Sequence, residues 1–281
     1  MSTPVTEAST SGAHAPLFGM SGVGVSFGGI TALDDVGLEV APHQVLGVIG
    51  PNGAGKTTLF NVVCGFVRPD AGRLTWQGRE LTGLRPRHLA RLGIGRTLQG
   101  LGLFDRMPVL ENVMVGADRH ARAGFLASLF ALPGSGREER ALRERAMAVL
   151  AELGVERYAA HLPPSLPYAI RKKVSLARAL VGEPELLLLD EPASGLAQDE
   201  MAELGERIRG LCSRMSVMLV EHHMDLVMQV CDDIVVLDFG KVIAQGDPDH
   251  IRSDPAVLAA YLGDEVGHHT GAGRPGATGG R

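Results

Sequence analysis

An eight-residue glycine-rich loop is the feature that most constrains what this chain can fold into. Residues 50–57 read GPNGAGKT and fit the phosphate-binding pattern GxxxxGK followed by Ser or Thr. The pattern indicates a phosphate site only when a strand precedes it and a helix follows it. Both are predicted here, because the apolar run Val45–Ile49 is typical of a buried strand and Thr57–Cys64 of a helix.

The loop and the first turn of the helix supply groups that suit the phosphates of a nucleotide. Glycines allow successive backbone N–H groups to turn inward around phosphate oxygens, and the helix N-terminus adds a positive partial charge. Lys56 is expected to reach the outer phosphates, and the hydroxyl of Thr57 is expected to hold magnesium. The predicted nucleotide-binding residues of this region are Gly50, Pro51, Asn52, Gly53, Ala54, Gly55, Lys56, Thr57 and Thr58.

Two carboxylates follow another apolar run. Leu186–Leu189 consists of leucine alone and is followed by Asp190 and Glu191. Ligands of α/β sheets bind at the carboxyl ends of the strands, so both acids are expected beside a ligand. Asp190 is predicted to bind the magnesium shell. Glu191 is predicted to polarise a water molecule for in-line attack on a γ-phosphate.

The pattern along the chain indicates an α/β fold with a helical insertion. Apolar runs such as Val217–Val220 and Ile234–Leu237 alternate with helical stretches, which is typical of strands buried on both faces and joined by crossover helices. Between about residues 99 and 180 the apolar residues recur at helical spacing in a charged background. We therefore predict one α/β domain over 17–264 with a helical subdomain at about 99–180.

Composition and the termini limit the function classes. A chain of 281 residues with 45% hydrophobic content can bury a sizeable core. The net charge of -5 gives no basic field, so nucleic acid is not an expected partner. No apolar run reaches the roughly 20 residues that span a bilayer, and no export signal is evident, which favours a cytosolic chain. Residues 1–16 and the glycine-rich 265–281 are predicted to be disordered.

In their order, these motifs resemble those of ATP-binding-cassette (ABC) transporter ATP-binding subunits, from about Phe18 to Leu262. The resemblance implies a P-loop NTPase (RecA-like) core with an inserted α-helical subdomain and an N-terminal antiparallel β subdomain. It also implies roles for two residues that carry no signal by themselves. Phe27 matches the aromatic residue that stacks on adenine, and Gln99 matches the glutamine that meets magnesium and the attacking water.

A histidine after a core strand is a further candidate that the resemblance implies. His222 matches the family's histidine that contacts the γ-phosphate. His223 stands where related sequences commonly carry Asp, so a shift of one residue in this match stays open, and the spacing favours His222. The catalytic candidates are then Glu191, His222 and Gln99, and the magnesium ligands are Thr57, Gln99 and Asp190.

The segment Pro167-Tyr168-Ala169-Ile170 looks like the family's LSGGQ signature, which closes over the ATP bound to a second subunit. It departs from the pattern, because Ala169 replaces a Gly and Ile170 replaces a Gln. Backbone N–H groups at a helix N-terminus survive a change of side chain, so affinity for an anion should persist. The methyl group of Ala169 can obstruct close approach to phosphate, so slow hydrolysis is an open alternative.

Within the family, the chain is most similar to subunits that power bacterial importers of branched-chain amino acids. The cues are the insertion Gly124–Glu138 and the segments Leu166-Pro167-Tyr168, Glu111-Asn112-Val113 and Tyr261-Leu262-Gly263. Urea or amide importers use closely similar subunits, and a poorly hydrolysing regulatory subunit that binds ATP is a further alternative.

The resemblance also implies ligands, partners and a location. The ligands are ATP and Mg²⁺, and the protein is expected at the cytoplasmic face of the cell membrane, as a peripheral subunit. The expected partners are a second ATPase subunit, in a homodimer or a heterodimer, membrane permease subunits, and a periplasmic or extracellular solute-binding protein. The apolar stretch Leu98–Val115 is either core of the helical subdomain or a groove for a permease helix.

Overall fold

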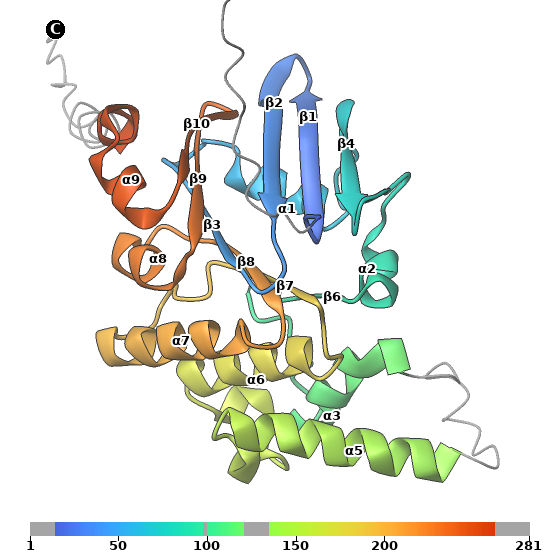
Figure 1. The fold of residues 1–281 in the computed structure, drawn as a ribbon. Helices are drawn as coiled ribbons and strands as arrows, with labels where there is room; N and C mark the ends of the chain where they lie inside the picture. The colour runs from blue at the N-terminus through green and yellow to red at the C-terminus, as the bar shows by residue number, and fades with distance from the viewer. Residues whose placement is uncertain (1–14, 98–99, 121–134, 262–281) are drawn as a thin grey trace, which may run out of the picture.

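The structure, a computed structural model, describes residues 15–97, 100–120 and 135–261. It consists of a six-stranded mixed sheet, a four-stranded antiparallel sheet and a group of helices (Figure 1). The predicted disordered tail 265–281, nearly all of the predicted extension 1–16, and Gln99 lie outside the described residues.

The six-stranded sheet has the order β10-β9-β3-β8-β7-β6. Its strands are β3 (Val45–Ile49), β6 (Ile94–Arg96), β7 (Leu186–Asp190), β8 (Ser216–Val220), β9 (Asp233–Asp238) and β10 (Lys241–Gly246). Neighbours pair in parallel except β9 and β10. Every residue of β3 and β8 is buried, because helices or the second sheet cover both faces. The strands predicted from apolar runs are confirmed.

The register of the parallel strands brings three strand ends to one edge. Val48 of β3 pairs with Val220 of β8, and Val220 pairs with Asp190 of β7. The segments that follow these strands therefore leave the sheet at the same edge. After β3 the chain passes through loop 50–55 into helix α1 (Lys56–Val63), which begins one residue before its predicted start.

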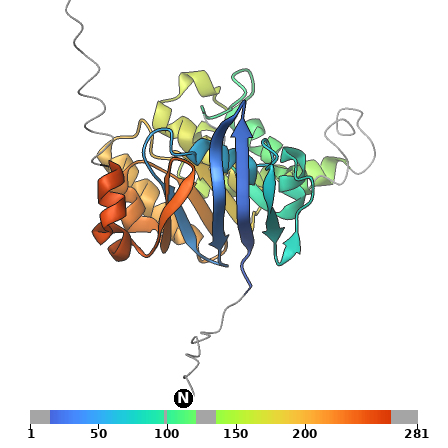
Figure 2. The same cartoon turned by 90° about the horizontal axis from the view of Figure 1, so that it is seen from above.

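The antiparallel sheet is the N-terminal β subdomain that the family resemblance implies. Its order is β2-β1-β4-β5, with β1 (Phe18–Phe27), β2 (Ile30–Val40), β4 (Ala71–Trp76) and β5 (Arg79–Glu80). Figure 2 shows β1 and β2 lying across the rest of the molecule. One apolar cluster joins both sheets, since it contains Val23 of β1, Leu46 of β3 and Leu59 of α1, all fully buried.

Helices lie both within and outside the range of about 99–180 that the sequence predicts as a helical subdomain. They are α2 (Pro86–Leu92), α3 (Val109–Met114), η1 (Val115–His120), α5 (Ser135–Glu152), η2 (Glu156–Tyr158), η3 (Pro163–Ser165), α6 (Tyr168–Leu180), α7 (Gln198–Leu211), α8 (Met224–Val230) and α9 (Pro248–Ser253). Helices α3, α5 and α6 pack on one another. Ala146 and Leu150 of α5 are fully buried, as their spacing predicts, and Leu153 follows the end of that helix.

The apolar stretch around α3 is predicted to be either core of the helical subdomain or a groove for a permease helix, and its residues differ in burial. Val109 and Leu110 are buried in the core, whereas Phe104 is 50% exposed. Within the parts of the chain that the structure describes, no helix is long and apolar enough to cross a membrane.

Candidate nucleotide and catalytic site

Glycine is required at two positions of the loop after β3. Gly50 has φ 150° and Gly55 has φ 104°, both in the region that side chains rarely adopt. A Cβ atom at Gly50 would lie 2.1 Å from the carbonyl oxygen of Leu237, and one at Gly55 would lie 2.7 Å from that of Ala32. The backbones of β9 and β2 therefore fix the path of the loop.

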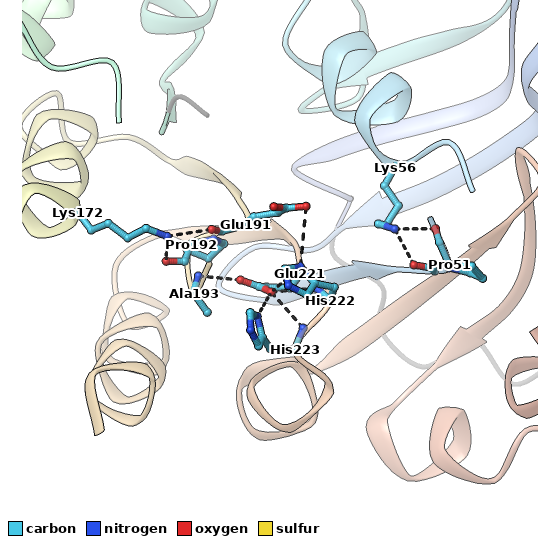
Figure 3. Close-up of polar contacts among 10 residues, drawn as sticks. Pro51, Lys56, Lys172, Glu191, Pro192, Ala193, Glu221, His222 and His223 are labelled. Atoms are coloured by element: carbon cyan, nitrogen blue, oxygen red, sulfur yellow. Dashed lines mark hydrogen bonds and ion pairs between the residues drawn. The ribbon is translucent and has the colours of Figure 1, made fainter. Parts of the chain in front are cut away.

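The rest of the loop presents polar groups and the start of α1. Lys56 is the first residue of α1, and its Nζ donates hydrogen bonds to the carbonyl oxygens of Gly50 at 2.6 Å and Pro51 at 2.8 Å (Figure 3). The ammonium group is thus held across the loop. Of the other predicted binding residues, Asn52, Gly53 and Thr57 are exposed, Thr58 is half-buried and Ala54 is buried.

Asp190 and Glu191 lie at the carboxyl end of β7. Asp190 is its last residue and is partly buried. Burial raises the pKa of Asp190, and the negative charges of Glu191 and Glu221 raise it further. Glu191 has a left-handed φ of 45°, and its N–H donates to the carbonyl oxygen of Val220 at 2.9 Å. This conformation costs a non-glycine residue roughly 1–2 kcal/mol, so surrounding contacts must hold it.

Of the two candidate histidines, His222 lies next to Glu191. Its Nδ1 is 3.9 Å from a Glu191 carboxylate oxygen, and its side chain is half exposed. His222 Nδ1 also lies 3.7 Å from a Glu221 carboxylate oxygen, and His223 pairs more closely with that group, its Nδ1 lying 2.9 Å away. The two imidazole rings stack with centroids 4.1 Å apart. His222 stays the predicted contact of the γ-phosphate, and its Nδ1 lies within 3.9 Å of carboxylate oxygens of both Glu191 and Glu221.

Glu221 is a fully buried carboxylate that connects two loops. It accepts hydrogen bonds from the backbone N–H groups of Ala193 at 2.7 Å, His222 at 2.8 Å and His223 at 3.2 Å, and from the His223 ring. Burial raises its pKa, but these four hydrogen bonds outweigh that effect, so the pKa of Glu221 is lowered. The group is therefore held as a carboxylate.

Lys172 of α6 reaches the same loop from the helical subdomain. Its Nζ donates to the carbonyl oxygens of Glu191 at 3.2 Å and Pro192 at 2.7 Å (Figure 3). Burial lowers the pKa of Lys172, while Glu221 and Glu191 act in the opposite direction. The lysine adjoins a cavity of about 210 Å³ between α6 and α7, which Glu191 also lines.

The signature segment forms the start of α6. Pro167 precedes the helix, and Tyr168, Ala169 and Ile170 make its first turn. The proline has no side-chain acceptor for the first N–H groups of the helix, so these donors depend on other partners. The predicted adenine-stacking residue Phe27 ends β1 and is 52% exposed, so it is not a core residue.

Sequence reasoning missed Glu221 and Lys172. The position of Glu221 carried a usable signal, because a charged residue directly after an apolar strand is rarely buried without partners. Lys172 carried none, since its contacts are to backbone atoms nineteen and twenty residues away.

The residues present fit a magnesium ion. Thr57 offers a hydroxyl oxygen and Asp190 a carboxylate, which are ligands that this cation prefers. Burial raises the pKa of Asp190 most, and the charges of Glu191 and Glu221 raise it further. A divalent cation would offset the negative charge of these carboxylates. Gln99, the other predicted ligand, lies outside the described residues.

Comparison with known families yields two matches. A family model described as ABC transporter matches residues 33–194. A second, described as Branched-chain amino acid ATP-binding cassette transporter, matches residues 241–267. The first match includes the loop, both carboxylates and the signature segment.

Individual relatives extend the similarity over most of the chain. It is 41% identical to the high-affinity branched-chain amino acid transport ATP-binding protein BraF of Pseudomonas aeruginosa over 251 residues, 89% of this chain and 98% of that protein. It is 38% identical to the high-affinity branched-chain amino acid transport ATP-binding protein LivG of Escherichia coli K12, with the same coverage.

Solved structures show the same fold. A nucleotide-free ATP-binding cassette from an ABC transporter superposes with a TM-score of 0.75 at 30% identity, covering 88% of this chain and 98% of that one. A cassette of an ABC transporter in its ADP conformation gives the same TM-score and identity. From the family models, the relatives and the shared fold, the chain belongs to the branched-chain amino acid family of ABC transporters, as an ATP-binding subunit and ATPase.

Proposed function

We propose that this subunit hydrolyses ATP with Mg²⁺ at the edge of the six-stranded sheet and that hydrolysis energises uptake of branched-chain amino acids. The observation that carries the proposal is the shared edge. The register of β3, β8 and β7 brings loop 50–57, the acids Asp190 and Glu191, and His222 to the carboxyl ends of three adjacent strands.

Each group has a defined task in this proposal. The backbone N–H groups of the loop and the Lys56 ammonium bind the phosphates, and Phe27 stacks on the adenine. Glu191 accepts the proton of the attacking water, while the water oxygen bonds to the γ-phosphorus and the bond to the leaving ADP oxygen breaks. His222 contacts the γ-phosphate, and Gln99 orients the water.

Magnesium, when bound by Thr57, Asp190 and Gln99, neutralises negative charge on the phosphate oxygens. The protein residues keep their own tasks of binding, orientation and proton transfer. Removal of the cation should therefore stop turnover.

The active form in this proposal is a dimer of ATPase subunits. Residues Pro167, Tyr168, Ala169 and Ile170 of one subunit close over the ATP held by loop 50–57 of the other. Contacts of the γ-phosphate favour the closed state, and hydrolysis removes those contacts, so the dimer reopens. The dimer lies at the cytoplasmic face of the membrane beneath permease subunits, and a solute-binding protein delivers the solute from the other side.

Uptake by the assembled transporter in vesicles tests the proposed solute. ATP-dependent accumulation of radiolabelled leucine, with no accumulation of urea or acetamide, is the expected result. Accumulation of urea or acetamide in place of leucine would contradict the assignment.

The departure of the signature at Ala169 and Ile170 favours one alternative, a subunit that binds ATP with little turnover of its own. Steady-state ATP hydrolysis by the purified chain separates the two. Turnover that appears only with a second, related ATPase subunit would support the alternative.

A further inference from the structure

The turn that follows β7 is hydrogen-bonded from two sides by side chains that have no direct role in the proposed hydrolysis. Lys172 donates to the carbonyl oxygens of Glu191 and Pro192, and Glu221 accepts from the N–H of Ala193 (Figure 3). Together these hydrogen bonds hold the backbone of three consecutive residues, Glu191, Pro192 and Ala193. The backbone of the turn is thereby tied both to α6 and to the end of β8.

The turn needs such support because it begins in an unfavourable conformation. Glu191 has φ 45°, and without restraint a glutamate leaves this region for a right-handed or extended one. A change in its φ swings the direction of the Cα–Cβ bond and carries the carboxylate with it. Restraint of the turn is therefore restraint of the carboxylate.

Glu221 also holds the backbone of His222, the histidine that lies beside Glu191. The same carboxylate oxygen that accepts from the His223 ring accepts the backbone N–H groups of His222 and His223. One fully buried group thus sets the position of the 222–223 backbone and of Ala193 together. Its lowered pKa keeps it an acceptor for all of these donors.

We propose that Glu221 and Lys172 are positioning residues that hold the Glu191–Ala193 turn and thereby aim the Glu191 carboxylate at the attacking water. The inference rests on the proposed function of Glu191. It adds a link between subdomains, because Lys172 belongs to α6, the helix that begins with the signature segment. Movement of α6 relative to the sheet then changes the aim of Glu191.

The test compares the chain with Glu221→Gln, Lys172→Met and Lys172→Arg. Glutamine keeps the shape of Glu221 but presents an N–H to donors, and methionine keeps the length of Lys172 without a donor. We expect kcat to fall about 10-fold to 100-fold for both, since a displaced catalytic group loses rate on that scale. KM for ATP and affinity for a fluorescent ATP analogue should stay within about twofold of wild type, because loop 50–57 is untouched. Arginine retains donors for the two carbonyl oxygens, so Lys172→Arg should recover most of kcat.

Matched controls come from a neighbouring pair. Lys173 of α6 donates to both carboxylate oxygens of Glu203 of α7, at 2.8 and 2.7 Å, so its ammonium group is directed to α7 and not to the turn. Lys173→Met and Glu203→Gln remove the ion pair between α6 and α7, in which Glu203 also pairs with Arg207, and leave the contacts of Lys172 and Glu221 with the turn in place. Both should keep kcat within about threefold of wild type, because the loss of a part-exposed pair costs about 1 kcal/mol or less.

A double-variant cycle separates failure of this inference from failure of the proposed function. If the two residues act through Glu191, Lys172→Met and Glu221→Gln should add no further loss of single-turnover rate in a Glu191→Gln background. Turnover that survives Glu191→Gln would overturn the proposed function. If Glu191→Gln has no turnover while Lys172→Met and Glu221→Gln keep a kcat near that of wild type, only the positioning role would be overturned.

A merely structural role predicts a different pattern. Variants that lose nucleotide affinity and kcat in parallel with the folded fraction would overturn the inference, as would failure of Lys172→Arg to recover activity. Lys172 is partly exposed, so its substitution tests the proposal even where replacement of the buried Glu221 prevents folding.

Discussion

Glu191 combines an unfavourable backbone conformation with a side chain that faces His222. Its φ of 45° is one of seven positive values at non-glycine residues in the described part of the chain, and it falls at the position predicted for proton transfer. Strain of this kind persists where neighbouring contacts impose it. Here the contacts come from Val220, Lys172 and, through Ala193, from Glu221.

At the same scale, Lys56 supplies the charge of the phosphate loop. Its Nζ lies across the carbonyl oxygens of Gly50 and Pro51, and phosphate binding offers it charged acceptors instead. We expect Lys56→Ala to weaken ATP binding about 100-fold, because the charge-assisted hydrogen bonds that it removes contribute about 3 kcal/mol. Equilibrium binding of a fluorescent ATP analogue measures this. Lys241→Ala, which removes a surface pair with Asp34, should bind normally, and unchanged affinity in Lys56→Ala would contradict the placement of the loop.

At the scale of elements, the unit of strand β3, loop and helix α1 depends on how closely β9 and β2 approach it. The carbonyl oxygen of Leu237 leaves no room for a side chain at Gly50, whereas nothing lies within 4 Å of a Cβ at Gly53. The two glycines share a positive φ but differ in space. A comparison of the two positions therefore distinguishes the cost of a positive φ from the cost of a steric clash with the Leu237 carbonyl oxygen.

Substitution of these two glycines by alanine should give different losses of stability. We expect Gly50→Ala to lower the free energy of unfolding by about 3 kcal/mol or more, because the sheet must shift to admit the methyl group. Gly53→Ala should cost about 1 kcal/mol, the cost of φ 79° alone. Denaturant unfolding of both variants measures the difference, and equal losses would mean that β9 does not constrain the loop.

The start of α6 carries the segment that resembles the family's signature, with Ala169 and Ile170 in place of Gly and Gln. Its first turn carries Tyr168, Ala169 and Ile170, and its backbone N–H groups remain available to an anion whatever the side chains. We expect the purified chain to hydrolyse ATP and Ala169→Gly with Ile170→Gln to raise kcat by a few-fold, with the gain coming from relief of crowding. If the wild-type chain shows no turnover and the double variant does, Ala169 and Ile170 prevent hydrolysis in the wild-type chain.

Sequence patterns predict the elements better than the contacts between them. The leucines of β7 and the glycines of the loop carry their own signals, because burial and backbone freedom are local requirements. The pairing of Glu221 with Ala193 depends on how β7 and β8 align, which no local pattern encodes. For the same reason Lys172 is indistinguishable from Lys173 in the sequence, although one holds the turn and the other pairs with Glu203.

In the proposed active assembly, two whole subunits share each ATP. Replacement of Glu191 by Gln leaves the binding groups in place and removes the proton acceptor, so the closed state should accumulate. We expect Glu191→Gln to run as a dimer in light scattering with saturating ATP and magnesium, and as a monomer without ATP. A variant that stays monomeric with ATP would refute the sharing of nucleotide between subunits.

Cation removal acts on the same assembly. Excess EDTA should abolish hydrolysis and reverse the ATP-dependent dimer, since negative charge at Asp190 and on the phosphates is then no longer offset. Readdition of Mg²⁺ should restore both. Hydrolysis that continues in EDTA would exclude the proposed magnesium site.

In the proposed mechanism, Glu191 activates water for hydrolysis of ATP held by loop 50–57. Steady-state ATP hydrolysis by the wild-type chain and by Glu191→Gln, under saturating ATP and magnesium, tests it most directly. We expect measurable wild-type turnover and a loss of at least about 100-fold in the variant, with ATP affinity retained. A variant that keeps half of the wild-type rate would contradict it.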